Sequence, residues 1–306
     1  MEQRLTPRQL AQATGVSESS IKRWCDAGVI DTVRTAGGHR RIPLHGAMQF
    51  LRDHDQELVH PQVLGLPDGT RRSMYRMEDA SQHLREALES GDEGTARQIL
   101  FDLYLGRCRL SEIGDQVIAP AFAAIGHRWE TGDVAIFQER RALELMRNLL
   151  HELRLSQKPL PKHAEVALGG TVSGDNYALA PILVELVLRE IGFRACFLGA
   201  NLPIETMEAA IRQQTPRLFW LSISHLEDEQ RFLEEYRRLC EAAGHRTAIV
   251  VGGRALHEPL RHKITYSAYC ETLQHLETFG NTLRAASGSV VMPSIESPPP
   301  TSPTSP

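Results

Sequence analysis

The apolar positions of this chain follow two patterns, which change over near residue 160. From residue 77 to residue 155 they recur every three to four residues, a spacing typical of amphipathic helices. Four stretches are expected to be helical: residues 78–90, 93–105, 111–126 and 136–155. Breaks that contain glycine separate them, so residues 77–158 are predicted to form a four-helix bundle.

After residue 160, short apolar runs alternate with amphipathic stretches. Strands are expected near residues 164–169, 194–198, 217–223, 247–252 and 264–268, and helices near residues 178–191, 204–214, 226–243 and 271–286. This alternation predicts a doubly wound, parallel, Rossmann-like sheet over residues 162–288. Ligands of such sheets bind beyond the carboxyl ends of the strands.

The first 55 residues carry shorter helical patterns and a basic hairpin. Thr6 and Ser17 stand where the N-caps of two short helices are expected. Residues 29–42 alternate in polarity and predict a hairpin with Gly37 and Gly38 at its tip. Residues 1–55 are therefore expected to form a winged helix-turn-helix, which makes the whole chain an α/β plus all-α protein.

Two segments show no sustained periodicity. Residues 56–76 are predicted to be a linker. Residues 289–306 are rich in proline, serine and threonine and cannot bury a core, so they are predicted to form a disordered tail.

Charge separates the N-terminal module from the rest of the chain. The net charge is −4, yet residues 1–54 contain eight Lys or Arg against five acidic residues. A basic module on an acidic body predicts a polyanionic partner. The five cysteines are scattered and never form a C-x-x-C pair, which favours reduced thiols in a cytoplasmic protein over a zinc site. No apolar run is long enough for a membrane span, so no membrane partner is expected.

The first 50 or so residues resemble the DNA-binding domain of the MerR superfamily. The resemblance rests on the segments Thr14-Gly15-Val16-Ser17, Ile21-Lys22-Arg23-Trp24, Ala27-Gly28-Val29-Ile30 and 34–41. In that family the second helix enters the major groove and the wing contacts the DNA backbone. By resemblance, two groups are expected at double-stranded operator DNA: Ser19, Ser20, Lys22 and Arg23 near base edges or phosphates, and Arg34, His39, Arg40 and Arg41 at phosphates. One such module has little contact area, which predicts binding by a homo-oligomer, a dimer or tetramer.

A glycine-rich segment opens the α/β part. Residues 169–180 leave an apolar run, pass through Gly169, Gly170 and Gly174, and re-enter a helical pattern. Three glycines in six residues let the backbone approach a bulky group, and the following helix start offers free N–H groups. A bound small molecule and a tight turn without a ligand are both open interpretations.

Part of the bundle is similar to the one that caps cobalamin in light-dependent repressors of the CarH/LitR type and in corrinoid proteins. There a tryptophan, nine residues and a Glu-His pair cover the upper face of the cofactor. Here Trp129 is followed by nine residues and then Glu139 and Arg140, so an arginine replaces the histidine. Trp129, Glu139 and Arg140 are the cap residues that the resemblance implies.

The sheet resembles the cobalamin-binding Rossmann-like domain of the same proteins. Their pattern is Asp-x-His-x-x-Gly, then Ser-x-Leu or Ser-x-Thr, then Gly-Gly, and the intervals between its parts are kept here. The positions that correspond to it, together with the preceding glycine, are Gly174, Asp175, Tyr177, Ser222, Ser224, Gly252 and Gly253. Tyr177 replaces the histidine that supplies an imidazole to cobalt, and Ala180 replaces the last glycine of the first motif.

These replacements leave three readings of the cavity. A phenol must lose its proton before it binds a metal, so Tyr177 does not replace the usual lower ligand. Cobalamin, as adenosylcobalamin, could still bind without a protein imidazole through Ser222, Ser224, Gly252 and Gly253. The cavity could instead hold haem or a bilin, with His127, His225 or a cysteine as the contact. The sheet could also be purely structural. The identity of any metal ligand is unknown at this point.

Enzyme signatures are missing from the sequence. It contains no G-x-S-x-G and no P-loop lysine, and His257-Glu258 lacks the second histidine of a zincin, because Arg261 stands at that spacing. We therefore expect a non-enzymatic transcriptional regulator, a repressor in a light-sensing role, in which a tetrapyrrole controls oligomerisation and operator binding. The alternative is a ligand-independent DNA-binding or protein-interaction factor.

Overall fold

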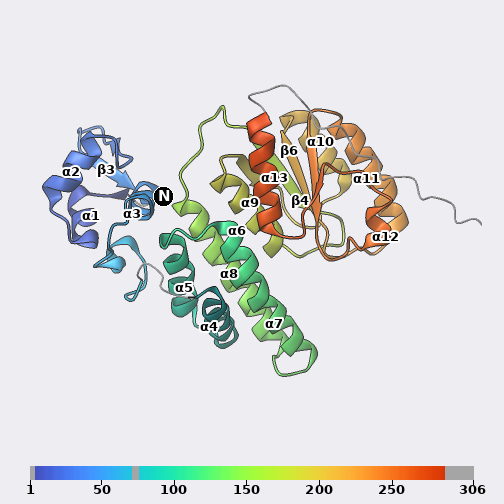
Figure 1. Ribbon diagram of the computed structural model, residues 1–306, viewed down its shortest axis with the longest axis horizontal. Helices are drawn as coiled ribbons and strands as arrows, with labels where there is room; N and C mark the ends of the chain where they lie inside the picture. The colour runs from blue at the N-terminus through green and yellow to red at the C-terminus, as the bar shows by residue number, and fades with distance from the viewer. Residues whose placement is uncertain (1–3, 71–75, 287–306) are drawn as a thin grey trace, which may run out of the picture.

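The computed structural model describes residues 4–70 and 76–286. They form three parts that follow one another along the chain: a small winged domain, a helical bundle, and a parallel sheet flanked by helices (Figure 1). The predicted tail and residues 71–75 of the predicted linker lie outside the described residues. No helix in the described ranges has both the length and the apolar character that a bilayer crossing requires.

The winged domain is built on one short antiparallel sheet and three helices. Its elements are β1 (Arg4–Leu5), α1 (Pro7–Thr14), α2 (Glu18–Asp26), β2 (Val33–Arg34), β3 (Arg40–Pro43) and α3 (Leu44–Asp53). Thr6 and Ser17 cap α1 and α2 as predicted, because each side-chain oxygen accepts a free N–H of the first helical turn. β3 pairs with both β1 and β2, which confirms the predicted hairpin. The sequence analysis did not predict β1 and α3.

The predicted linker contains a 3₁₀ helix, η1 (Pro61–Leu64). Pro61 and Leu64 are buried, and the N–H groups of Val59 and His60 donate to the carbonyl of Ala13. This part of the segment therefore packs against α1.

The bundle contains α4 (Met77–Ser90), α5 (Glu93–Leu105), α6 (Leu110–Ile113), the π-helical segment η2 (Gly114–Ile118), α7 (Ala119–Glu130) and α8 (Ile136–Ser156). The predicted third helix is thus not uniform, because η2 widens it. The carboxylate of Asp115 in η2 accepts the N–H groups of Leu273 and Gln274, at 2.9 and 3.0 Å. The widened turn places this carboxylate at a helix start in the α/β part, where N–H groups lack partners.

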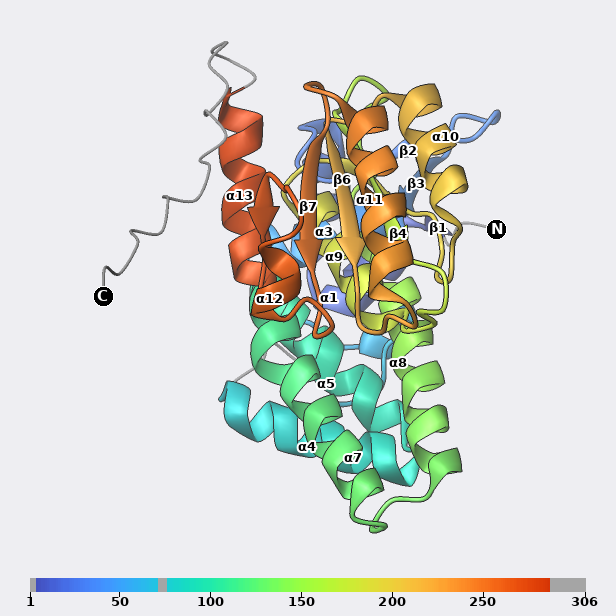
Figure 2. The same cartoon turned by 90° about the vertical axis from the view of Figure 1, so that its right-hand side faces the viewer.

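The α/β part is a five-stranded parallel sheet with the order β5-β4-β6-β7-β8. Its elements are β4 (Val166–Thr171), α9 (Leu179–Glu190), β5 (Arg194–Phe197), α10 (Ile204–Gln214), β6 (Leu218–Ser222), α11 (Glu229–Ala243), β7 (Ala248–Gly252), α12 (Glu258–Arg261), β8 (Ala268–Tyr269) and α13 (Leu273–Ala286). α9 and α13 cover one face, and α10 and α11 the other (Figure 2). The order reverses between β4 and β6, and such a switch point is where ligands of open α/β sheets bind. The fold prediction was wrong only in detail: α12 was missed, and the last strand lies at the end of its predicted range.

Gly169 and Gly170 both lie inside β4, although the strand was expected to end at Gly169 and Gly170 was expected in the following loop. A side chain on Gly169 would clash with the ring of Trp220, which is 2% exposed on β6. A Cβ atom on Gly170 would lie 2.9 Å from the carbonyl oxygen of Gly199. The bulky group that Gly169 accommodates is therefore part of the chain itself.

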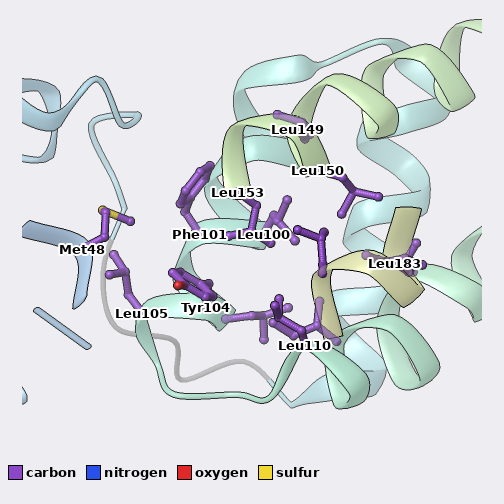
Figure 3. Packing of buried hydrophobic residues seen from close by; sticks show 14 of the residues in the cluster. Met48, Leu100, Phe101, Tyr104, Leu105, Leu110, Leu149, Leu150, Leu153 and Leu183 are labelled. Carbon is purple, nitrogen blue, oxygen red and sulfur yellow. The ribbon is translucent and has the colours of Figure 1, made fainter. Parts of the chain in front are cut away.

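One apolar core runs through all three parts of the molecule. It joins Met48 of α3, Leu105 of α5, Leu153 of α8 and Leu183 of α9 (Figure 3). The winged domain is therefore packed on the bundle, and the bundle on the sheet.

We expect Gly169→Ala to lower the free energy of unfolding by about 1–3 kcal/mol, because the new methyl group overpacks the contact with Trp220. Gly126→Ala is the matched control. Nothing lies within 4 Å of the methyl group at this position in α7, so the change should stabilise the protein by about 0.5–1 kcal/mol. Urea unfolding of the three proteins measures both effects, and equal stability of Gly169→Ala and wild type would contradict the packing argument.

Candidate functional site

The carboxyl edge of the sheet is organised by Asp175, which is 1% exposed. Its Oδ1 atom accepts the N–H of Tyr177 at 3.0 Å. Its Oδ2 atom accepts the N–H groups of Ser224 at 2.5 Å and His225 at 3.3 Å. Charge-assisted bonds of this kind are stronger than neutral ones. One buried carboxylate thus joins the loop after β4 to the loop after β6.

Asn201 joins the loop after β5 to the loop after β4. The N–H of Gly174 donates to Asn201 Oδ1 at 2.8 Å, and the N–H of Asn201 donates to Thr171 Oγ1 at 2.8 Å. Thr171 and Asn201 were not selected from the sequence. The available signal was an asparagine shortly after an expected strand, a residue that favours left-handed turn positions, and Asn201 does have a positive φ of 56°.

Gly252 and Gly253 let three strand ends approach one another. A Cβ atom on Gly253, which has a φ of 116°, would lie 2.3 Å from the carbonyl oxygen of Ile223. A Cβ atom on Gly252 would lie 2.7 Å from the carbonyl oxygen of Cys270. Both glycines are therefore required by the backbone of this edge, whatever they contact in addition.

Ser222 is the last residue of β6, opposite Gly252 of β7, and Ser224 lies two residues further along the chain. Ser222 is buried, and the carbonyl oxygen of Ser224 accepts Nε of Arg254 at 3.2 Å. Arg254 is exposed at this edge and was not selected from the sequence. It brings a positive charge to the side of the sheet that faces the bundle.

Tyr177 belongs to the loop after β4 and is 37% exposed. Burial raises the pKa of its phenol, the charge of Arg254 lowers it, and the charge of Glu139 raises it further. Because the net shift is upward, the phenol is protonated at neutral pH and is a poor metal ligand. Glu139 belongs to α8 and Arg254 to the sheet edge, so charges from both the bundle and the sheet act on this phenol.

The α7–α8 turn carries a group of exposed apolar side chains, which we call the cap cluster: Trp129, Ile136 and Phe137. They are 45%, 62% and 65% exposed. Glu139 follows one helical turn behind and pairs with the exposed Arg140 at 3.4 Å. Figure 2 shows this end of α7 and α8 projecting from the bundle. Ile136 and Phe137 were not selected from the sequence, although two apolar residues in a first helical turn depart from the amphipathic pattern.

In the part of the chain that the structure describes, side chains that could bind a metal ion are not clustered at this site. Across the described ranges no group of three or more His, Cys, Asp or Glu side chains could hold a metal ion. His127 and His225 are both exposed, one on α7 and one in the loop after β6. Burial raises the pKa of the Cys270 thiol to about 11, which keeps it protonated. Among the described residues, this edge therefore provides no cluster of protein ligands for a metal ion.

The predicted DNA-binding residues of α2 lie on its solvent side. The hydroxyl of Ser17 bonds to those of Ser19 and Ser20, at 2.9 and 3.0 Å. Lys22 pairs with Glu18 at 2.8 Å, and Arg23 is exposed. The second helix thus presents a polar surface, on which Lys22 is paired with Glu18 and Arg23 is exposed.

The wing residues divide into two groups. Arg40 forms an ion pair with Asp26 at the end of α2, so it fixes the wing to that helix. The half-buried Arg41 donates to the carbonyl of Arg40. Arg34 and His39 are exposed at the tip, and Arg34 reaches only the carbonyl of Gly38, at 3.4 Å. Their contacts with phosphates stay predictions.

Comparison with known proteins connects these features. Residues 4–52 match the family described as a helix-turn-helix domain, and residues 80–154 match the B12 binding domain family. The chain is 28% identical over 281 residues to the HTH-type transcriptional repressor CarH of Myxococcus xanthus, a match that covers 86% of this chain and 91% of that protein. It is 26% identical over 294 residues to the repressor CarA of the same organism, covering 91% and 97%.

A solved structure supports the fold of the C-terminal parts. The monomethylamine corrinoid protein of Methanosarcina barkeri superposes with a TM-score of 0.57 at 16% identity, over 68% of this chain and all of that chain. The predicted fold class is confirmed, and among the predicted ligands cobalamin is supported. The chain is therefore similar to CarH-type transcriptional repressors along most of its length, and it combines a helix-turn-helix domain with a B12 binding domain.

Proposed function

We propose that this protein is a repressor that binds operator DNA through α2 and the wing, and that cobalamin bound between bundle and sheet controls its affinity for DNA. The observation that carries the proposal is the cap cluster, an exposed apolar surface on the turn that leads into α8. Exposed apolar groups of this kind mark binding sites. They lie in the domain that matches the B12 binding family.

Residues from the bundle and from the sheet would contact opposite faces of the ligand. Trp129 and Phe137 would contact one flat face, while Tyr177 and the loops joined by Asp175 would contact the other. Gly174, Ser222, Ser224, Gly252 and Gly253 would line the sheet side of the ligand, and Glu139 and Arg140 the bundle side. Since Tyr177 supplies no imidazole, the cobalamin would bind without a protein nitrogen at this position. When adenosylcobalamin is the form bound, it supplies a cobalt–carbon bond that light breaks.

Regulation would act through association of subunits. A single winged domain makes few contacts with DNA, so joining several in a homo-oligomer raises the affinity for a repeated operator. A ligand that fixes the packing of the bundle on the sheet would change the surface through which subunits associate. We propose that this control responds to light and that the associated state is a dimer or a tetramer.

We expect Phe137→Ala to weaken cobalamin binding about tenfold, because the change removes a large apolar contact. Leu155→Ala is the matched control: this leucine is 68% exposed on the same helix but lies at its other end, so binding should stay unchanged. Absorption spectra of the purified proteins, titrated in the dark with adenosylcobalamin, haem and biliverdin, measure binding. Spectra equal to those of the free ligands in all three cases would refute a tetrapyrrole sensor, and a bound-state spectrum with haem or biliverdin alone would replace cobalamin.

Tyr177→Phe is expected to leave the spectrum of bound cobalamin unchanged between pH 7 and pH 9. The raised pKa of the phenol keeps it neutral over this range, so the hydroxyl does not bind the metal. Tyr177→His restores an imidazole at this position and should change the spectrum in the visible region. A spectrum of the wild type that changes with pH while that of Tyr177→Phe does not would show that the phenolate binds.

Arg34→Ala is expected to reduce the slope of log affinity against log salt by about 0.9, the value for one phosphate contact. Arg40→Ala should reduce it less, because Asp26 already neutralises that arginine. Arg147→Ala removes the same charge from an exposed pair with Glu144 on α8, away from the proposed ligand site, and serves as the control. The measurement is fluorescence anisotropy with a duplex selected by the wild type from a randomised pool. Equal slopes for wild type and Arg34→Ala would contradict the assignment of the wing.

A further inference from the structure

Arg52 of α3 lies where the winged domain, the bundle and the sheet meet. Its Nη2 atom donates to Glu190 Oε1 at 2.7 Å and to the carbonyl oxygen of Cys108 at 3.1 Å. Its guanidinium group stacks on the ring of Tyr104, 4.4 Å from the centroid. The side chains of Arg52 and Glu190 are 13% and 21% exposed, so most of this pair is shielded from water. A single side chain therefore contacts all three parts.

Glu190 is held on the other side by the bundle. Its Oε2 atom accepts the N–H of Leu110 at 2.8 Å, at the start of α6. Burial raises the pKa of Glu190, and the charge of Arg52 and the N–H of Leu110 lower it. A carboxylate in this position is costly without its partners, so the pair favours one orientation of α3 over others.

A second arginine, Arg107, binds the end of α3 at the place where the winged domain meets the bundle. Arg107 Nε donates to the carbonyl oxygen of Arg52 at 2.5 Å, and its Nη2 atom donates to that of Asp53. These carbonyl groups belong to the last turn of α3, where carbonyl groups have no hydrogen-bond partner inside the helix. By contrast, the pair of Lys158 with Asp31 is largely exposed and contributes little to the docking.

α9 connects this junction to the proposed ligand site. The helix starts at Leu179, two residues after Tyr177, and ends at Glu190. Its 12 residues form a rod of about 18 Å. Leu183 in its middle belongs to the apolar core that also contains Met48 and Leu105 (Figure 3). A displacement of the loop after β4 would reach the winged domain through this rod, because packed helices move as units.

We propose that Arg52 is a positioning residue for DNA binding, which fixes the orientation of the winged domain relative to the cobalamin site through Glu190 and α9. This inference rests on the proposed function, because it names the contacts that would connect the cobalamin site with the DNA-binding surface. Coupling between two sites is measured as the ratio of DNA affinities with and without the ligand.

The test uses the full chain, adenosylcobalamin in the dark, and the duplex selected by the wild type. We expect a wild-type ratio of about tenfold, within the usual range of such couplings. Arg52→Ala and Glu190→Gln should both bring the ratio to within about twofold of one, while cobalamin affinity without DNA stays within about twofold of wild type. The two variants change the net charge in opposite directions, so a shared loss of coupling cannot come from net charge.

Two further variants separate positioning from stability. Arg52→Lys keeps the charge but loses the fork and the planar stack, so its ratio should lie between those of the wild type and Arg52→Ala. Arg147→Ala removes an arginine from an exposed pair with Glu144 on α8 and should keep the wild-type ratio. Hydrogen exchange at the amide of Leu110 should accelerate in Glu190→Gln without any ligand.

The outcomes distinguish the two proposals. A wild-type protein whose spectrum shows no bound cobalamin contradicts the proposed function. Bound cobalamin with a wild-type ratio of one, or with a ratio that Arg52→Ala leaves unchanged, overturns the inference about Arg52 alone. Unchanged exchange at Leu110 in Glu190→Gln also overturns it, since the junction would then not hold that segment.

Discussion

The buried carboxylate of Asp175 is the constraint on which the ligand-facing edge of this protein depends. A carboxylate that is 1% exposed must be compensated, and it is compensated by three backbone N–H groups from two loops. Since these donors are backbone groups, the arrangement does not depend on which side chains the loops carry. Tyr177 can therefore stand where the related motif has a histidine without loss of the loop geometry. The chemistry at this position is free to change while the shape of the edge is kept.

The same distinction between local and distant causes explains what the sequence could predict. Helix and strand positions were largely right because they follow from local periodicity, as for α5 and α10, whose bounds agree with the prediction. The errors arose where a distant partner decides. Gly169 is set by Trp220, the widened turn at η2 by the start of α13, and the pairing of Arg40 by Asp26. Trp129 and Asp175 were found by motif, but Asn201, Arg254 and Phe137 belong to the site through contacts or exposure that no local pattern encodes.

The continuous core restricts how regulation can work. A winged domain on a free tether would sample many orientations, and events at the sheet would not reach it. Here Met48 and Arg52 on α3 are packed against the bundle, one through apolar contact and one through a shielded ion pair. The apolar contact supplies stability but little direction, because it is non-directional. The ion pair and its hydrogen bonds supply the orientation, because they are satisfied in one geometry.

This division of roles also bears on the two replaced histidines. With Tyr177 below and Arg140 above, neither position offers an imidazole, yet the cap cluster and the network of Asp175 are intact. Selection of a ligand at this site must then rest on shape, apolar contact and hydrogen bonds, all of which respond to how closely α8 approaches the sheet. A ligand recognised in this way acts on the protein through the packing of its two layers. α9 takes part in this packing and belongs to the same core as the winged domain. A change of ligand and a change of DNA-binding geometry would therefore depend on the same contacts.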